Sequence, residues 1–351
     1  MIREKNEKET MRPFVSVIMP VRNEDGFIER SLGAVLRQTY PKDRLEIVIA
    51  DGISTDATRE IIDELARGTE IPIFVVDNPK QIAPTGLNRA LEKAAGEIIV
   101  RVDGHCEIEP DYVENCVSLL ESGKADGVGG PIETIGENAR ARAIALAMSS
   151  KFGVGGSAFR TIDDREMYTD TVAFPGYTRS IIDRAGPFNE ELVRNQDDEY
   201  NFRIRKLGGR ILLSPEIRSR YYSRSTFKRL WRQYYQYGYW KVRVMQLHPR
   251  QMSIRQFVPA LFVVSLVGWG LLATFSMLGR AAFVLVFASY LFANLSAAVL
   301  TAKTKLRLIP LLSLSFAILH LSYGLGFLVG LIALRSRWAA TRIGERSASA
   351  D

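Results

Sequence analysis

Three short segments of the sequence place carboxylate and imidazole groups where they could bind a charged ligand or move a proton. Asp103 and His105 lie two residues apart in RVDGHCE, and these two ligand types can bind a divalent ion that bridges a diphosphate. Asp51 ends an apolar run and could accept hydrogen bonds from a nucleobase or a ribose. Asp197 begins three consecutive acidic residues, and a carboxylate can act as general base toward a hydroxyl group.

Each of these groups also has a structural interpretation. Asp103 and His105 could belong to an ordinary turn around Gly104, and Asp56 is more simply a helix cap than a ligand. Acidic residues in the first turn of a helix are favoured by the helix dipole, although three in a row are more than capping needs. Cys106 is expected to be a small buried side chain rather than a ligand.

The elements that must position these groups alternate between strands and helices. We expect strands at residues 14–19, 45–50, 71–76 and 98–102, and helices at residues 27–38, 58–66 and 85–94. This alternation predicts an α/β fold with a mostly parallel, doubly wound sheet, which binds ligands at the carboxyl ends of its strands. That edge would carry the residues at the strand ends, namely Pro20, Arg22, Asn23, Glu24, Asp51, Gly52, Ser54, Asp56, Thr58, Asp103 and His105.

The second half of the sequence is basic and strongly apolar. Residues 217–344 contain 17 Lys and Arg and no Asp or Glu. Their first part, RLWRQYYQYGYWKVRVMQLHPR, mixes aromatic and cationic residues, which suits a helix in the headgroup layer of a bilayer as well as stacking on nucleic-acid bases. The stretches 257–278, 281–300 and 308–334 are long enough to be embedded in a membrane. We therefore expect a lipid bilayer as partner and no nucleic acid.

The positive charges do not fit three full crossings of a membrane. Lysines and arginines at residues 218–255, 303–307 and 335–342 all favour the cytoplasmic side, but three crossings would leave the two ends on opposite sides. We expect either a tail outside the cytoplasm or one re-entrant segment. Residues 308–334 are expected to bend, because they contain Gly324, Gly326 and Gly330.

These patterns divide the chain into five parts. We expect a flexible tail at residues 1–12, whose charges exclude a signal peptide, and a catalytic domain at 13–216. An amphipathic interface segment at 217–256, a membrane domain with about three apolar segments at 257–338 and a flexible tail at 339–351 would follow. The two cysteines, Cys106 and Cys116, are too few for a disulfide framework and indicate a reducing compartment.

The segments together resemble a known family of enzymes. VSVIMPVRNE, IADGISTDAT, RVDGHCE, NQDDEYNFR and QYGYW occur in the order and approximate spacing of the family 2 glycosyltransferases, over residues 14–245. The chain is most similar to bacterial exopolysaccharide glycosyltransferases of the succinoglycan-biosynthesis type, which join this domain to C-terminal membrane helices. The resemblance implies a GT-A type fold and transfer of a sugar, with inversion, from a UDP-sugar, expected to be UDP-glucose.

The resemblance also implies roles for individual residues. Asp103 and His105 stand at the family's Asp-x-Asp motif, which binds Mn²⁺ or Mg²⁺, and the histidine suits Mn²⁺ better than Mg²⁺. Asp197 matches the catalytic Asp of a Glu-Asp pair, in which Gln196 replaces the Glu, and would take the acceptor proton. The nucleotide-sugar would be bound by Pro20, Arg22, Glu24, Asp51 and Asp103.

The implied acceptor is a saccharide linked to a polyprenyl diphosphate, at the cytoplasmic face of the bacterial inner membrane. QYGYW resembles the Gln-x-x-Arg-Trp motif of processive synthases, except that Tyr239 replaces the Arg. An arginine can pair with phosphate through two hydrogen bonds, although basic residues also attract anionic lipids. The candidate acceptor-binding residues are Asp198, Gln236, Trp240, Arg229 and Arg232.

Other functions are compatible with parts of the pattern. A polyprenyl-phosphate glycosyltransferase would use a bare lipid phosphate, and the presence of Gln236 and Trp240 disfavours it. A processive polysaccharide synthase would need a conduit, for which three embedded segments are few. A non-catalytic membrane scaffold would have lost its acidic residues, yet Asp51, Asp103 and Asp197 are present.

Overall fold

The computed structural model describes residues 12–223 and 225–338, which form two units. Unit 1 consists of residues 12–132, 162–190 and 203–221, and unit 2 of the described residues within 133–161, 191–202 and 222–338. The tails predicted at 1–12 and 339–351 lie outside the described residues, apart from Arg12. The domain boundaries predicted from the sequence stay predictions.

Unit 1 is built on an eight-stranded sheet with the strand order β3-β2-β1-β4-β9-β6-β10-β8. β1 pairs in parallel with β2 and β4, and β2 pairs in parallel with β3. β9 is antiparallel to both of its neighbours, β4 and β6. The strands are β1 (Val15–Val21), β2 (Leu45–Asp51), β3 (Ile73–Asp77), β4 (Ile98–Arg101), β6 (Gly127–Gly130), β8 (Met167–Tyr168), β9 (Ala173–Thr178) and β10 (Ile211–Leu213).

The first four strands confirm the predicted α/β fold with a mostly parallel, doubly wound sheet. The three expected helices are present as α1 (Ile28–Leu36), α2 (Thr58–Arg67) and α3 (Ala83–Lys93). β2 is buried at every residue, as apolar strands are when helices cover both faces of a parallel sheet. α3 packs on β1 and β2, and α4 (Tyr112–Glu121) packs on β6 and β9.

A second, smaller sheet has the strand order β5-β11-β7. β5 (Cys106–Ile108) is antiparallel to β11 (Ser219–Tyr222), and β7 comprises Ile132–Ile135. β5 begins directly after His105, so this pairing fixes one end of the loop that follows β4. Cys106 and Cys116 are free thiols and buried, which confirms the expectation for Cys106.

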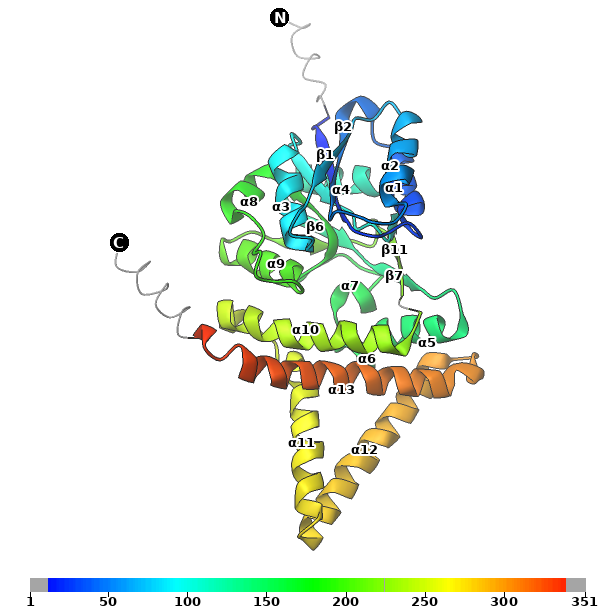
Figure 1. Cartoon of the computed structure of the whole chain (residues 1–351), viewed down its shortest axis with the longest axis vertical. Coiled ribbons are helices and arrows are strands. Elements are labelled where there is room, and N and C mark those ends of the chain that lie inside the picture. The colour runs from blue at the N-terminus through cyan, green and yellow to red at the C-terminus, as the bar shows by residue number, and fades with distance from the viewer. Residues whose placement is uncertain (1–11, 224, 339–351) are drawn as a thin grey trace, which may run out of the picture. The chain divides into compact units, whose positions relative to one another are not determined.

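Unit 2 is mostly helical. In Figure 1, α10 and α13 run side by side, and α11 and α12 form a hairpin. α9 (Gln196–Lys206) begins in unit 2. The other helices are α5 (Ala139–Met148), α6 (Lys151–Val154), α7 (Ala158–Thr161), α10 (Phe227–Leu247), α11 (Val258–Ala273), α12 (Met277–Ala302) and α13 (Ile309–Ala333), with 3₁₀ turns η2 (Pro249–Gln251), η3 (Ile254–Gln256) and η4 (Leu306–Leu308).

Two segments in the described part of the chain are long and apolar enough to cross a membrane. They are Met277–Ala302 and Leu306–Ala333, with mean hydropathies of 2.1 and 1.9. α11 has 16 residues, fewer than the roughly 20 that a full span needs. Of the three apolar segments expected from the sequence, two therefore have the length of a span.

Glycines bring the backbones of α10 and α13 into contact. A Cβ atom at Gly238 would lie 2.0 Å from the carbonyl oxygen of Tyr323, and one at Gly326 would lie 2.0 Å from that of Tyr235. No side chain fits at such distances, so both positions require glycine. The prediction of a bend within residues 308–334 is wrong, because α13 is one continuous helix whose glycines allow close packing.

Replacing Gly326 with alanine is expected to destabilise the protein. The added methyl group would collide with the backbone of α10, and such overpacking costs about 1–3 kcal/mol. The matched control is Gly268→Ala in α11, where no atom lies within 4 Å of the added Cβ. Thermal unfolding of the purified proteins in detergent should show a lower Tm for Gly326→Ala only. Equal Tm values for the two variants would contradict the close contact of α10 with α13.

Candidate functional site

Neighbouring strands of unit 1 end at the same edge of the sheet. Val21 at the end of β1 pairs with Asp51 at the end of β2, and Asp51 pairs with Asp77 at the end of β3. β4 lies on the other side of β1 and ends at Arg101, two residues before Asp103. The strand ends that the sequence predicts to carry a site therefore meet at one edge.

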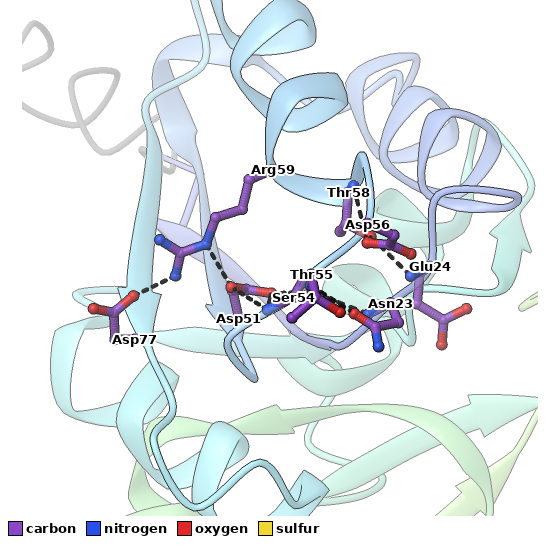
Figure 2. A network of polar contacts seen from close by, with 9 residues as sticks. All are labelled: Asn23, Glu24, Asp51, Ser54, Thr55, Asp56, Thr58, Arg59 and Asp77. Carbon is purple, nitrogen blue, oxygen red and sulfur yellow. Dashed lines mark hydrogen bonds and ion pairs between the residues drawn. The ribbon is translucent and has the colours of Figure 1, made fainter.

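Asp51 is the buried centre of this edge (Figure 2). Its carboxylate accepts hydrogen bonds from the Ser54 N–H at 3.1 Å, from the Ser54 hydroxyl at 2.5 Å and from Arg59 Nε at 2.5 Å. Arg59 also pairs with Asp77 through a second guanidinium nitrogen. A buried carboxylate depends on such partners, because an unpaired charge in a protein interior is strongly destabilising. Asp51 thus joins the ends of β2 and β3 to the first turn of α2.

Two residues in the adjoining loops have left-handed backbone conformations. Asn23 has a φ of 51° and Ile53 a φ of 54°. Asparagine tolerates this region, whereas in a β-branched residue it stores strain of about 1–3 kcal/mol. Asn23 N–H donates to the Ser54 hydroxyl at 2.9 Å, and Thr55 N–H donates to Asn23 Oδ1 at 2.9 Å. These bonds hold the loops after β1 and β2 together in the strained conformation.

Asp56 precedes the N-cap of α2, Ala57, and its side chain binds the first N–H group of the helix, which is the role of a cap that the sequence predicts for Asp56. Its carboxylate accepts hydrogen bonds from the Thr58 N–H at 3.1 Å, from the Thr58 hydroxyl at 2.5 Å and from the Asp25 N–H at 3.3 Å. Burial alone would raise the pKa of Asp56, but these hydrogen bonds to the charged form outweigh burial and lower it. The Thr58 hydroxyl also accepts a hydrogen bond from the Glu24 N–H at 2.8 Å, so the cap positions Glu24.

Pro20 and Arg22 reach the same edge and are less buried than Asp51. The exposed Arg22 lies against Gly52, where an added Cβ would be 3.1 Å from Arg22 Cβ. An added Cβ at Gly86, in α3, would be 3.4 Å from Pro20 Cβ. The small residues at positions 52 and 86 therefore leave room for these two predicted site residues.

Asp103 is oriented by the residue two places before it. Arg101 Nε and Nη2 donate hydrogen bonds to the two carboxylate oxygens of Asp103, at 2.9 and 3.2 Å. Arg101 is buried and Asp103 is partly exposed. The pair therefore presents a fixed carboxylate at the end of β4.

His105 is held by Glu24 from the loop after β1. His105 Nδ1 and Glu24 Oε1 are 3.0 Å apart, and the imidazole packs edge-on against Tyr221 with ring centroids 5.4 Å apart. An added Cβ at Gly104 would lie 3.0 Å from Glu24 Cγ, so glycine allows this approach. Burial by itself would lower the pKa of His105, but the hydrogen bond with Glu24 and the nearby negative charges raise it to about 9. The structure thus brings two predicted site residues together.

Asp103 and His105 offer two metal ligands rather than a complete set. Among residues 12–223 and 225–338, no three His, Cys, Asp or Glu side chains are grouped to hold a metal ion. Glu24 occupies Nδ1 of His105, so Nε2 is the nitrogen that a metal could bind once it has released its proton, and a carboxylate on the other nitrogen is the usual support of such a histidine. These ligands fit a divalent ion whose other ligands come from a bound diphosphate and water.

In unit 2, the acidic run at the start of α9 is tied to α10 and its C-cap. Asp198 pairs with the buried Lys241, and Glu199 Oε1 lies 3.0 Å from His248 Nε2. Asp197 is partly exposed in the same turn. Two of the three carboxylates therefore anchor the helical turn that carries Asp197.

The predicted acceptor-binding residues lie on α9 and α10. Arg194 Nε donates to Gln236 Oε1 at 3.2 Å, and Arg194 precedes α9 by two residues, so Gln236 lies beside the loop that leads to Asp197. Arg229 and Arg232 are exposed. Trp240 packs against a hydrophobic cluster formed by Leu192, Phe202 and Val244.

The sequence did not reveal the cations that hold the predicted carboxylates. Arg59, Arg101 and Lys241 pair with Asp51, Asp103 and Asp198, respectively. Only Arg101 could have been expected from the sequence, because it lies two residues before its partner. Lys241 is 43 residues from its partner, and Arg59 reaches Asp51 only because α2 folds back over the strand end.

The edge formed by β3, β2, β1 and β4 is the strand-end edge at which a doubly wound α/β sheet binds its ligand. Comparison with known families shows that the protein is a glycosyltransferase. The chain belongs to glycosyl transferase family 2, whose model matches residues 16–185.

The chain is similar to two relatives and to one solved structure. It is 32% identical over 246 residues to the succinoglycan biosynthesis protein ExoA of Rhizobium meliloti, covering 69% of this chain and 73% of ExoA. It is 32% identical over 234 residues to the dolichyl N-acetyl-alpha-D-glucosaminyl phosphate 3-beta-D-2,3-diacetamido-2,3-dideoxy-beta-D-glucuronosyltransferase of Methanococcus voltae, covering 64% and 72%. The mannosyltransferase PcManGT from Pyrobaculum calidifontis, solved with GDP-Man and Mn²⁺, has a TM-score of 0.60 at 21% identity, over 92% of this chain and 88% of that one, which confirms the fold.

Removing the hydrogen bonds of Asp56 to Thr58 with Asp56→Ala is expected to lower stability by about 0.5–2 kcal/mol at neutral pH, as the loss of a helix cap does. The pKa of Asp56 is lower in the folded protein than its ordinary value of 3.8, so its contribution is present above that value and is lost as pH falls through the folded pKa. Denaturant unfolding at several pH values should show the difference from wild type shrink in acid. Asp63→Ala, an exposed acid later in α2, is the control. A difference that does not depend on pH would contradict the hydrogen-bonded, charged cap.

Proposed function

We propose that the protein transfers a sugar, with inversion, from a UDP-sugar to a saccharide linked to a polyprenyl diphosphate, in bacterial exopolysaccharide biosynthesis. The observation that carries this proposal is the strand-end edge of unit 1, with its buried Asp51, its oriented Asp103 and its Glu24–His105 pair. Similarity to a succinoglycan biosynthesis protein supports the exopolysaccharide product. Similarity to a transferase named for a dolichyl phosphate-linked sugar supports a lipid-linked acceptor.

The nucleotide of the donor would bind at the ends of β1 and β2. Asp51 would accept a hydrogen bond from the base or ribose, and Ser54 and Arg59 keep its carboxylate in place for this role. Pro20, Arg22 and Glu24 would contact the same nucleotide. We expect UDP-glucose as donor, and the GDP-Man of the PcManGT structure makes GDP the alternative to test against UDP.

A divalent ion would be held by Asp103 and by Nε2 of His105. When bound, it would supply the positive charge that stabilises a departing diphosphate. Arg101 keeps the Asp103 carboxylate oriented, and Glu24 keeps the imidazole ring in place. The Mn²⁺ in the PcManGT structure supports an ion of this kind.

Asp197 would act as the general base. Its carboxylate would accept the proton of an acceptor hydroxyl while the hydroxyl oxygen bonds to the anomeric carbon of the donor. The bond from that carbon to the diphosphate oxygen breaks on the opposite face, so UDP leaves and the configuration inverts. Holding two substrates for such an in-line attack is worth about 7–11 kcal/mol. The pairs of Asp198 with Lys241 and of Glu199 with His248 would keep the turn of Asp197 in place.

The acceptor would meet the protein at α10, from the cytoplasmic side of the bacterial inner membrane. The exposed Arg229 and Arg232 can pair with a diphosphate through two hydrogen bonds each. Asp198, Gln236 and Trp240 would contribute to binding of the acceptor saccharide. The two segments long and apolar enough to cross a membrane support a lipid bilayer as the place where a polyprenyl acceptor is found.

Nucleotide release by the detergent-purified protein tests the proposal. Several UDP-sugars and GDP-mannose are compared with Mn²⁺, Mg²⁺ or a chelator, each with and without a lipid-linked saccharide. Metal-dependent release from one UDP-sugar that requires the glycolipid would support the proposed reaction. Equal stimulation by bare polyprenyl phosphate would instead identify a polyprenyl-phosphate glycosyltransferase, and release from GDP-mannose alone would overturn the UDP donor.

Asp197→Asn is expected to bind the donor as wild type does and to lose transfer by about 10²–10⁴-fold, the usual contribution of a general base. Titration calorimetry with UDP and the release assay measure the two effects separately. The control is Asp183→Asn, an exposed carboxylate on α8 (Arg179–Ala185), which should retain both properties. Undiminished transfer by Asp197→Asn would remove this residue from the mechanism.

His105→Asp is expected to shift the metal preference from Mn²⁺ toward Mg²⁺. The substitution replaces an imidazole nitrogen by a carboxylate oxygen, the ligand that Mg²⁺ prefers. The affinity of the UDP-bound protein for each ion, measured by calorimetry, should change in opposite directions for the two ions. Asp103→Asn serves as comparison and should weaken both. Unchanged affinities in His105→Asp would show that His105 does not bind the metal.

A further inference from the structure

The apolar helices of unit 2 differ in how far the protein itself covers them. In the most apolar stretch of the segment Leu306–Ala333, which contains α13, 44% of the residues are buried. In the most apolar stretch of α12, only 11% of the residues are buried. α11 and α12 expose large apolar side chains along their length and at the turn between them, where Phe275 and Met277 are 89% and 81% exposed. The hairpin thus has the surface of a lipid-embedded element, whereas one face of α13 belongs to the interior of the unit.

α13 packs lengthwise on α10, with the two helices running in the same direction. Added Cβ atoms at Gly326 and Gly330 would lie 2.0 and 2.7 Å from the carbonyl oxygens of Tyr235 and Tyr239. Near the ends of both helices, Gln246 Nε2 donates a hydrogen bond to the carbonyl oxygen of Leu334, at 2.9 Å. The second half of α13 is therefore in continuous contact with α10.

The first half of α13 packs on α5 and α6. His320 Nε2 lies 2.8 Å from the Phe152 carbonyl oxygen, and an added Cβ at Gly153 would be 3.2 Å from Leu319 Cδ1. α5 contacts α13 directly and carries Arg140 in its first turn. Both halves of α13 therefore lie against helices that carry charged residues.

α10 itself cannot cross a hydrocarbon layer. Its 21 residues include five Lys and Arg, and each cation is costly in the middle of a bilayer. Lys241 pairs with Asp198, and Arg243 Nε donates to Glu191 at 2.9 Å, which ties α10 to further acidic residues. Because α13 lies alongside α10 in close contact, α13 cannot cross the bilayer unless α10 crosses with it.

Both open ends of the hairpin contact the region of α5, α6 and α7. Before α11, Arg255 Nη1 donates to the Gly156 carbonyl oxygen at 2.7 Å, in the segment between α6 and α7. After α12, η4 packs on α5. The ends also carry the cations that suit anionic headgroups, namely Arg250, Arg255, Lys303, Lys305 and Arg307.

We propose that only the α11–α12 hairpin enters the lipid bilayer, and that α13 lies in the plane of the membrane surface, against α10 and α5. The chain then emerges from α13 on the same side of the membrane as α10. The cations of α10, of residues 303–307 and of Arg335 and Arg337 then lie on one side, which removes the conflict that three crossings created. The proposal rests on the membrane location in the proposed function, but not on the transfer reaction.

The side of the membrane reached by single cysteines tests this arrangement. Ser336→Cys lies just after α13, Lys305→Cys lies between α12 and α13, and Ala139→Cys in α5 is the reference; all three positions are exposed. The full-length variants are expressed in cells and treated with a membrane-impermeant maleimide before and after permeabilisation. Wild-type protein supplies the background, because Cys106 and Cys116 are buried. Carbonate extraction of the same membranes reports whether the chain is embedded.

The expected result is a carbonate-resistant protein in which all three cysteines share one pattern, unlabelled before permeabilisation and labelled after it. Labelling of Ser336→Cys from the side opposite to Ala139→Cys would overturn the proposal, since it would require α13 to cross. Release of the protein by carbonate would refute both the inserted hairpin and the membrane location in the proposed function. The nucleotide-release assay on the same variants shows separately whether the transferase proposal holds.

Discussion

A buried carboxylate at the end of β2 holds together the functional edge of unit 1. Asp51 is fully buried, so its charge must be compensated within the protein, and Arg59 and Ser54 provide this compensation. The Ser54 hydroxyl also receives the N–H of Asn23, which ties the loop after β1 to the loop after β2. From the same loop after β1, Glu24 holds His105. A continuous set of contacts thus connects the nucleotide end of the proposed site with its metal end.

In unit 2, α10 has a comparable central place. One side of the helix holds Asp198 through Lys241 and the preceding loop through Gln236, which accepts a hydrogen bond from Arg194. Another face packs closely on α13 at Gly238. QYGYW is therefore a packing motif as well as a candidate acceptor site. In the proposed arrangement, α13 packs on the charged α10 at the membrane surface, and the exposed hairpin of α11 and α12 anchors both helices in lipid.

The features that were predicted correctly depend on residues close together in the sequence, and those that were missed depend on contacts between distant segments. All four strands at the edge, the helices between them and the Asp56 cap were predicted, because they follow from periodicity and from contacts within a few residues. The bend expected at Gly324, Gly326 and Gly330 was wrong, because the sequence does not show that another backbone occupies the space beside these glycines. The partners of Asp51 and Asp198 were missed for the same reason.

The class of the protein followed from the resemblance of its motifs to the family 2 glycosyltransferases, and the doubly wound fold and the apolar second half followed from local patterns, because neither inference needs long-range information. How the acidic groups are held, in contrast, depends on the folded chain. The pairing of Asp51 with Arg59, of His105 with Glu24 and of α10 with α13 joins segments whose contact depends on the packing of the chain. Burial makes these pairings strong, because a charge or a backbone shielded from water has no other partner, and burial is a property of the folded chain alone.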